Sequence, residues 1–365
     1  MTIQEAFETR ANNFDLLRLV AALLVLWSHS YTLTGTGPEL FHWLTDGYDT
    51  GGGMGVAIFF AISGFLVARS VTVHASGQYL LNRILRIVPA LALVTVFEIF
   101  CLGPMVTSLG LVDYLLHPDT LQHARNIFVF GVSFTLPGVF TSLPHTGVNG
   151  SIWTLALECG FYLLLPVAMV CGLLSRRGVL LLVAAVAGLV LWGSQAWGLS
   201  WANMGGELWA GASLFPVLRY GLVFVLGAAL WVHRGSVPVS GGLALACLIL
   251  LYAFANRPGA QLVYLMALPY LVIYVALARP LSFDVKERFG DMSYGAYLFA
   301  FPMQQLLIWA FGPEVGPTAI SAMATPLALA AGFVSWHLVE RPALDLRYRR
   351  GVTQDLARRH PAPTV

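Results

Sequence analysis

Ten long apolar runs are the feature that most restricts what this 365-residue chain can fold into. A helix needs about 20 apolar residues to cross the hydrocarbon core of a bilayer, where every backbone polar group must be satisfied inside the protein. The runs predict an all-α integral membrane protein, a bundle of about ten transmembrane helices that forms one domain over residues 1–345. The predicted spans lie near residues 14–34, 54–73, 84–103, 151–174, 178–197, 212–233, 238–255, 261–278, 291–311 and 319–338.

The composition agrees with a membrane protein. Only 10% of the residues are charged, against about 25% in soluble domains, and the formal net charge is +2. This balance excludes a soluble globular domain and argues against nucleic-acid binding. We interpret the four unpaired cysteines as inert, small, buried side chains, and no cluster of His and carboxylates has metal-ligand spacing. The four are Cys101, Cys159, Cys171 and Cys247.

The positive charges predict the orientation, because Lys and Arg concentrate in cytoplasmic loops. With the N-terminus inside, the inside segments hold most of these residues and the outside segments hold only Arg125 and Arg257. Both termini are therefore expected to be cytoplasmic, and the polar tail 346–365 to be disordered. Of the outside segments, 104–149 is expected to lie on the membrane surface or to re-enter the protein, and 35–53 fits a lid or a plain flexible loop.

Two ionisable residues of the first span share a helix face. Arg18 and His29 are eleven residues apart, which is three turns and about 16 Å along a helix. Because ionisable groups inside a membrane are costly, His29 is a candidate general base, although a histidine that only packs between helices also fits. Asp15 can pair with Arg18 on the helix surface, in which case Arg18 is either functional or a cytoplasmic anchor.

Arg83 and Arg86 lie on adjacent turns at the start of the third span, where they could bind a phosphate group or lipid headgroups. In the fourth span Glu158 and Tyr162 share a face, and we expect Glu158 or the buried Glu98 to partner His29. A protonated Glu158 that only holds helices together is the alternative.

Five short motifs, in this order, resemble the membrane acyltransferase-3 family, from about residue 12 to Glu340. They are FDLLR with Arg18 followed by His29; FFAISGFL with Ser63, Gly64 and Phe65; RILRIVP with Arg83, Arg86 and Pro89; SIWTLALECGFYLLLP with Trp153, Glu158 and Tyr162; and SYGAYLFAFP with Ser293, Tyr294 and Tyr297. One departure is Ala300, where many members have histidine.

The resemblance implies an enzyme of the bacterial inner membrane that transfers an acyl group, usually acetyl, from cytoplasmic acyl-CoA to a hydroxyl of a carbohydrate or glycoconjugate. It implies that Arg18 and His29 are essential and that Arg83 and Arg86 handle the donor, with Ser63 beside them. Acetyl-CoA would be a co-substrate, with no permanently bound cofactor. Asp15, Glu98, Trp153, Tyr162, Ser293 and Tyr297 are expected in supporting roles.

Two questions of mechanism and class stay open at this stage. Transfer can be direct, with His29 as the base, or can pass through an acyl-enzyme, with Ser63 or Ser151 as the carrier. A proton-coupled transporter would also explain many spans and a buried histidine, and a catalytically inactive scaffold for glycan assembly would keep the same fold. The sequence identifies neither the acceptor nor the oligomeric state.

Overall fold

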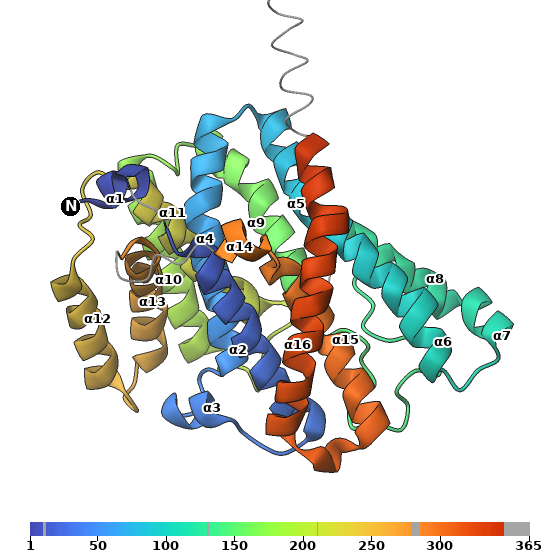
Figure 1. Ribbon diagram of the computed structural model, residues 1–365. Helices are drawn as coiled ribbons and strands as arrows, with labels where there is room; N and C mark the ends of the chain where they lie inside the picture. Colours follow the sequence, from blue (N-terminus) through green and yellow to red (C-terminus); the bar gives the residue numbers. More distant parts are fainter. Residues whose placement is uncertain (10–11, 130, 210, 279–284, 347–365) are drawn as a thin grey trace, which may run out of the picture.

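A computed structural model describes residues 1–9, 12–129, 131–209, 211–278 and 285–346. The described part of the chain is mainly helical and has almost no sheet, which confirms the predicted fold class (Figure 1). The long helices are α2 (Phe14–Thr34), α4 (Gly51–Val73), α5 (Ser76–Phe97), α9 (Trp153–Val170), α10 (Arg176–Ala196), α11 (Leu214–Val232), α12 (Gly241–Phe254), α13 (Ala260–Leu277), α15 (Ser293–Phe311) and α16 (Pro317–Ser335). The short elements are α1 (Ile3–Thr9), α3 (Leu40–Leu44), α6 (Gly103–Val106), α7 (Leu111–Leu116), α8 (Pro118–Ala124), α14 (Val285–Phe289) and a hairpin of β1 (Glu207–Trp209) and β2 (Ala212–Ser213).

Within the described ranges, eight helices are long and apolar enough to cross a membrane. They are α2, α4, α5 with its continuation to Val106, α9, α10, α11, α13 and α16 with its continuation to Leu346. Of the ten predicted spans, α12 is short at 14 residues, and α15 carries tyrosines and two buried glutamines that lower its hydropathy. Ten crossings therefore stay a prediction.

The centre of the bundle is the contact between α4 and α11, where two glycines let the backbones approach. A Cβ on Gly64 would lie 2.0 Å from the carbonyl oxygen of Phe224, and one on Gly227 would lie 2.3 Å from that of Ala61. Small residues make such close packing possible in a membrane bundle. By contrast, α10 lies at the rim, with only 17% of its apolar window buried inside the protein.

The first helix and the end of α16 lie at the same face of the bundle, the upper one in Figure 1. Two cytoplasmic termini would require this arrangement, and the orientation itself stays a prediction. In the tail predicted to be disordered, residues 347–365 lie outside the described part of the chain.

Two of the segments between spans contain short helices. The segment that follows α2 forms α3 at the lower face, and α5 continues through a π-helical turn (Glu98–Leu102) into α6 before α7 and α8 fold back beside it (Figure 1).

The expectation of buried cysteines is wrong. All four are free thiols, but Cys101 and Cys171 are exposed on the protein surface, while Cys159 and Cys247 are partly buried.

Candidate active site

Three cavities lie in a row through the bundle. The largest, with a volume of about 390 Å³, contains His29, and we name it the histidine pocket. A cavity of about 50 Å³, lined mainly by aromatic rings such as Phe59 and Phe60, is the aromatic passage. The third, of about 70 Å³, contains Arg18, Arg83 and Arg86 and is the arginine pocket.

Shared wall residues show that these cavities adjoin. The histidine pocket and the aromatic passage have three residues in common, and so do the aromatic passage and the arginine pocket. The first set is Val56, Thr154 and Tyr297, and the second is Phe59, Glu158 and Tyr294. The three cavities therefore adjoin one another in a row from the arginines to the histidine, with walls from α2, α4, α5, α9 and α15.

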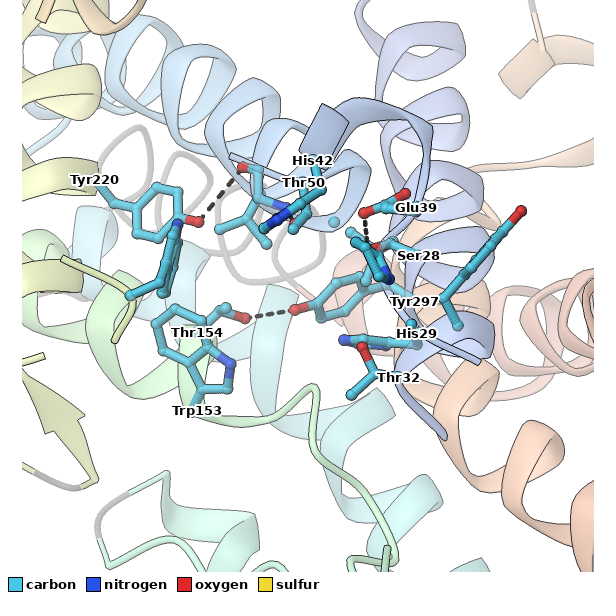
Figure 2. Close-up of a pocket in the computed structure, with 18 residues that line it drawn as sticks. Ser28, His29, Thr32, Glu39, His42, Thr50, Trp153, Thr154, Tyr220 and Tyr297 are labelled. Atoms are coloured by element: carbon cyan, nitrogen blue, oxygen red, sulfur yellow. Dashed lines mark hydrogen bonds between the residues drawn. The ribbon is translucent and has the colours of Figure 1, made fainter. Parts of the chain in front are cut away.

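The histidine pocket places one wall from α2 opposite a wall of aromatic rings. Figure 2 shows His29 and Thr32 of α2 on one side, and Trp153 and Tyr220 of α9 and α11 on the other. The His29 ring packs edge-on against Phe301 with ring centroids 5.2 Å apart, and no described residue hydrogen-bonds its buried Nδ1. The imidazole is thus held by packing, with its polar atoms left for other partners.

The segment around α3 supplies a carboxylate and a second histidine to this pocket. The Oε1 atom of Glu39 accepts hydrogen bonds from the Ser28 hydroxyl, at 2.5 Å, and from the Gly51 N–H, at 2.7 Å. Burial raises the pKa of Glu39, and hydrogen bonds from Ser28 and from the backbone of Gly51 and Gly52 oppose that shift. His42 lines the pocket as well. Sequence reasoning identified this segment as a lid candidate but did not single out Glu39 or His42.

A buried ion pair ties the end of this segment to α11. Arg219 and Asp49 are 0% and 1% exposed, with their charged atoms 2.6 Å apart. The guanidinium also donates to the Tyr48 carbonyl and lies over the Trp201 and Tyr220 rings, at 5.5 and 5.8 Å. Sequence reasoning missed this pair, although a lone arginine inside an apolar span is a strong signal.

The three arginines of the arginine pocket differ in their partners. Arg18 pairs with Asp15 at 3.1 Å, as predicted, in a partly exposed position. Arg86 pairs with two buried carboxylates, on Asp291 at 2.8 Å and Glu340 at 3.4 Å. Two carboxylates therefore already hold the Arg86 guanidinium, and its expected role in donor binding stays a prediction.

Arg83 is the arginine best placed to meet an anion. Its guanidinium lies 5.5 Å from the centre of the Tyr162 ring, and its buried Nε has no hydrogen-bond partner among the described residues. Beside it, the Ser63 hydroxyl donates to Glu158 at 3.0 Å and lies 2.9 Å from the Tyr162 hydroxyl, which also bonds to Glu158. Glu158 therefore belongs to the arginine pocket, and the predicted pairing of Glu158 with His29 is wrong.

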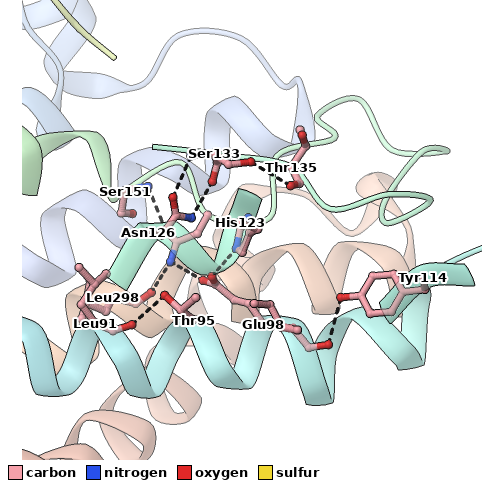
Figure 3. Close-up of polar contacts among 12 residues, drawn as sticks. Leu91, Thr95, Glu98, Tyr114, His123, Asn126, Ser133, Thr135, Ser151 and Leu298 are labelled. Carbon is pink, nitrogen blue, oxygen red and sulfur yellow. Dashed lines mark hydrogen bonds and ion pairs between the residues drawn. The ribbon is translucent and has the colours of Figure 1, made fainter. Parts of the chain in front are cut away.

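The rival carboxylate, Glu98, has other partners too. Figure 3 shows it at the π-helical turn beside His123, whose Nε2 lies 2.9 Å from one carboxylate oxygen, and Asn149 donates to the other oxygen at 2.7 Å. Asn149 also donates to the Leu298 carbonyl, which joins α5, α15 and the start of α9. Glu98 is thus paired with His123 and Asn149 rather than with His29.

The remaining predicted residues lie along this row of cavities or beside it. The Tyr297 hydroxyl is 2.7 Å from the Thr154 hydroxyl at the junction of the histidine pocket and the aromatic passage. Ser293 lines the arginine pocket but donates to Asp291 at 2.8 Å, which gives it a structural partner. Ala300 belongs to the same buried hydrophobic cluster as Leu26 of α2.

The fold and the cavities define a multi-pass integral membrane protein in which a row of adjoining cavities lies between a cationic pocket and a buried histidine. A family model for an acyltransferase domain, Acyl_transf_3, matches residues 12–337, and the chain belongs to this acyltransferase-3 family.

Two relatives carry names that agree with this family. The chain is 33% identical to an O-acetyl transferase of Shigella phage Sf6, over 91% of this chain and 96% of the phage protein. It is 32% identical to nodulation protein 10 of Rhizobium leguminosarum bv. viciae, over 92% and 94% of the two chains. No solved structure matches the chain significantly. The chain is therefore a membrane acyltransferase, which requires an acyl donor and a hydroxyl acceptor.

Proposed function

We propose that the protein transfers an acetyl group from cytoplasmic acetyl-CoA to a hydroxyl of a carbohydrate or glycoconjugate, with His29 as the general base, in the inner membrane of a bacterium. The observation that carries this proposal is the row of cavities that joins the arginine pocket to His29. A donor with phosphates at one end and a thin thioester arm at the other matches such a row of cavities.

The donor binds with its phosphates toward the arginine pocket. Arg83 supplies the cation, and under the predicted orientation this pocket lies in the cytoplasmic half of the bundle, where acetyl-CoA is found. The arm then follows the aromatic passage between Phe59 and Tyr294, whose rings exclude water from the thioester. Ser63 and Glu158 provide polar contacts where the arm enters.

The transfer takes place in the histidine pocket. The neutral His29 ring takes the proton of the acceptor hydroxyl as its oxygen attacks the thioester carbon. The C–O ester bond forms, the C–S bond breaks, and the proton passes from His29 to the departing thiolate, so that the products are an O-acetyl ester and CoA. Packing against Phe301 holds the ring in place during these steps.

The test is donor turnover by the purified full chain in detergent. Acetyl-CoA labelled in its acetyl group is supplied with and without chemically de-O-acetylated surface glycan of the source organism. The proposal predicts glycan-dependent release of CoA and label in the glycan as an ester that hydroxylamine removes. Folded protein that neither binds nor consumes acetyl-CoA would contradict the proposal, and a gradient-dependent transporter or an inactive scaffold would then replace it.

Direct transfer and an acyl-enzyme relay differ in one observable. Ser63 lines the arginine pocket, whereas the buried Ser151 hydroxyl has no hydrogen-bond partner among the described residues and lies outside the three cavities. Labelled donor added without acceptor and quenched rapidly in acid should leave no label on the protein if transfer is direct. Stoichiometric label that is lost in Ser63→Ala would establish the relay instead.

A further inference from the structure

The histidine pocket contains a buried carboxylate, that of Glu39, with hydrogen-bond donors among the described residues at only one of its two oxygens. Glu39 is 3% exposed, and its hydrogen bonds from Ser28 and Gly51 both go to Oε1. The other oxygen, Oε2, is buried and has no hydrogen-bond partner among the described residues. A buried carboxylate oxygen without a donor is unfavourable, so its retention in the wall of a cavity calls for a donor from outside the protein.

The surroundings of Glu39 indicate what kind of donor this is. Figure 2 shows Glu39 on the α2 and α3 side of the pocket, with the Trp153 and Tyr220 rings on the opposite side. Flat aromatic faces offer apolar contact to the C–H faces of a sugar ring, and a carboxylate accepts hydrogen bonds from its hydroxyls. A cavity of about 390 Å³ is also in the size range of small-molecule sites.

From this geometry we infer that Glu39 Oε2 binds a second hydroxyl of the acceptor sugar, adjacent to the hydroxyl that is acetylated at His29. The inference rests on the proposed function and deepens it, because it identifies a specificity-determining residue for the acceptor. The negative charge also favours a neutral or amino sugar and disfavours a carboxylate at that position of the acceptor.

A purely structural role for Glu39 makes a different prediction. Its hydrogen bond from Gly51 caps the first turn of α4, where a carboxylate is favoured by the helix dipole. A capping role alone affects folding and leaves the acceptor KM unchanged. Glu39→Gln separates the two roles, because the amide oxygen can still accept from Ser28 and Gly51 while an N–H donor replaces the Oε2 acceptor.

The experiment measures the acceptor KM and the donor KM of the full-length protein in detergent, with labelled acetyl-CoA and de-O-acetylated glycan titrated separately. The matched control is Asp46→Asn, which removes an exposed acid from the same loop without touching the pocket. We expect Glu39→Gln to raise the acceptor KM about 10- to 100-fold, the range for a hydrogen bond to a charged group, with the donor KM unchanged. Asp46→Asn should match the unaltered protein.

Two results would overturn the inference. One is an acceptor KM for Glu39→Gln equal to that of Asp46→Asn, in protein that unfolds at the same temperature. The other applies if Glu39→Gln does not fold. Glu39→Asp is then measured instead, because its shorter side chain keeps the charge but withdraws it from the pocket. An acceptor KM for Glu39→Asp equal to that of the unaltered protein would refute the inference. Failure of the unaltered protein to label any glycan would instead refute the proposed function, so the two failures are distinguishable.

Discussion

Replacing Asp49 by asparagine would leave a fully buried guanidinium without its counter-ion. The two charged atoms are 2.6 Å apart, and at an effective dielectric constant of about 20 their gross attraction is about 6 kcal/mol. Desolvation offsets part of this attraction in the intact pair, but removing one partner of a buried pair typically costs about 3 to 5 kcal/mol. We therefore expect Asp49→Asn to lower the free energy of unfolding by about 3 to 5 kcal/mol.

The assay is denaturant unfolding in detergent micelles, followed by tryptophan fluorescence. Asp15→Asn is the matched control. Its pair with Arg18 is likewise within ion-pair distance, at 3.1 Å, but the two side chains are 26% and 23% exposed, so the pair should contribute less than about 1 kcal/mol. The double variant with leucine at both positions 49 and 219 should recover much of the loss, since it removes both buried charges. A loss for Asp49→Asn no larger than that for Asp15→Asn would refute the reasoning.

Three further predictions concern packing, charge and pH. Gly64→Ala should destabilise the protein by more than about 2 kcal/mol, because the added methyl group would push α4 away from α11. Gly188→Ala is the control: its Cβ would meet open space, so it should be neutral or slightly stabilising in the same unfolding assay. Arg83→Ala should weaken acetyl-CoA binding in equilibrium dialysis with little loss of stability. Arg86→Ala should lower the free energy of unfolding by about 3 kcal/mol, because it removes the cation that two buried carboxylates share. Equal effects of the two variants on stability would contradict this assignment. Burial raises the pKa of Glu39 above its ordinary 4.5. The free energy of unfolding of the unaltered protein, relative to that of Glu39→Gln, should therefore fall as pH rises from about 4.5 and level off above the folded-state pKa. A difference that stays flat or rises with pH would contradict this prediction.

The helical framework could be predicted because the bilayer leaves few choices. An apolar run of about 20 residues has to be helical to satisfy its backbone, so hydropathy alone locates most of the spans. Hydropathy is a weaker guide for α12, which is only 14 residues long, and for α15, whose tyrosines and whose Gln304 and Gln305 lower its mean hydropathy. Those glutamines are buried against neighbouring protein segments rather than lipid, and hydropathy does not distinguish the two surroundings.

The candidate site could be predicted only along single helices. Helical periodicity places Arg18 and His29 on one face, and the motifs point to Arg83, but periodicity does not say which helices face each other. Periodicity alone therefore leaves both Glu158 and Glu98 as partners for His29, and the structure places Glu158 with Ser63 instead. Periodicity does not predict pocket residues that come from loops either. Glu39 lines the histidine pocket because of the conformation of the α3 segment, which is not a regular span.

The most direct test of the account is acetyl transfer by His29→Ala, measured beside His233→Ala, whose histidine lies outside the three cavities. A general base contributes about 100- to 10,000-fold to the rate, so His29→Ala should transfer label to glycan at least about 100-fold more slowly while binding acetyl-CoA normally in equilibrium dialysis. His233→Ala should keep the full rate. Transfer by folded His29→Ala at the rate of His233→Ala would contradict the central claim that the reaction takes place at His29.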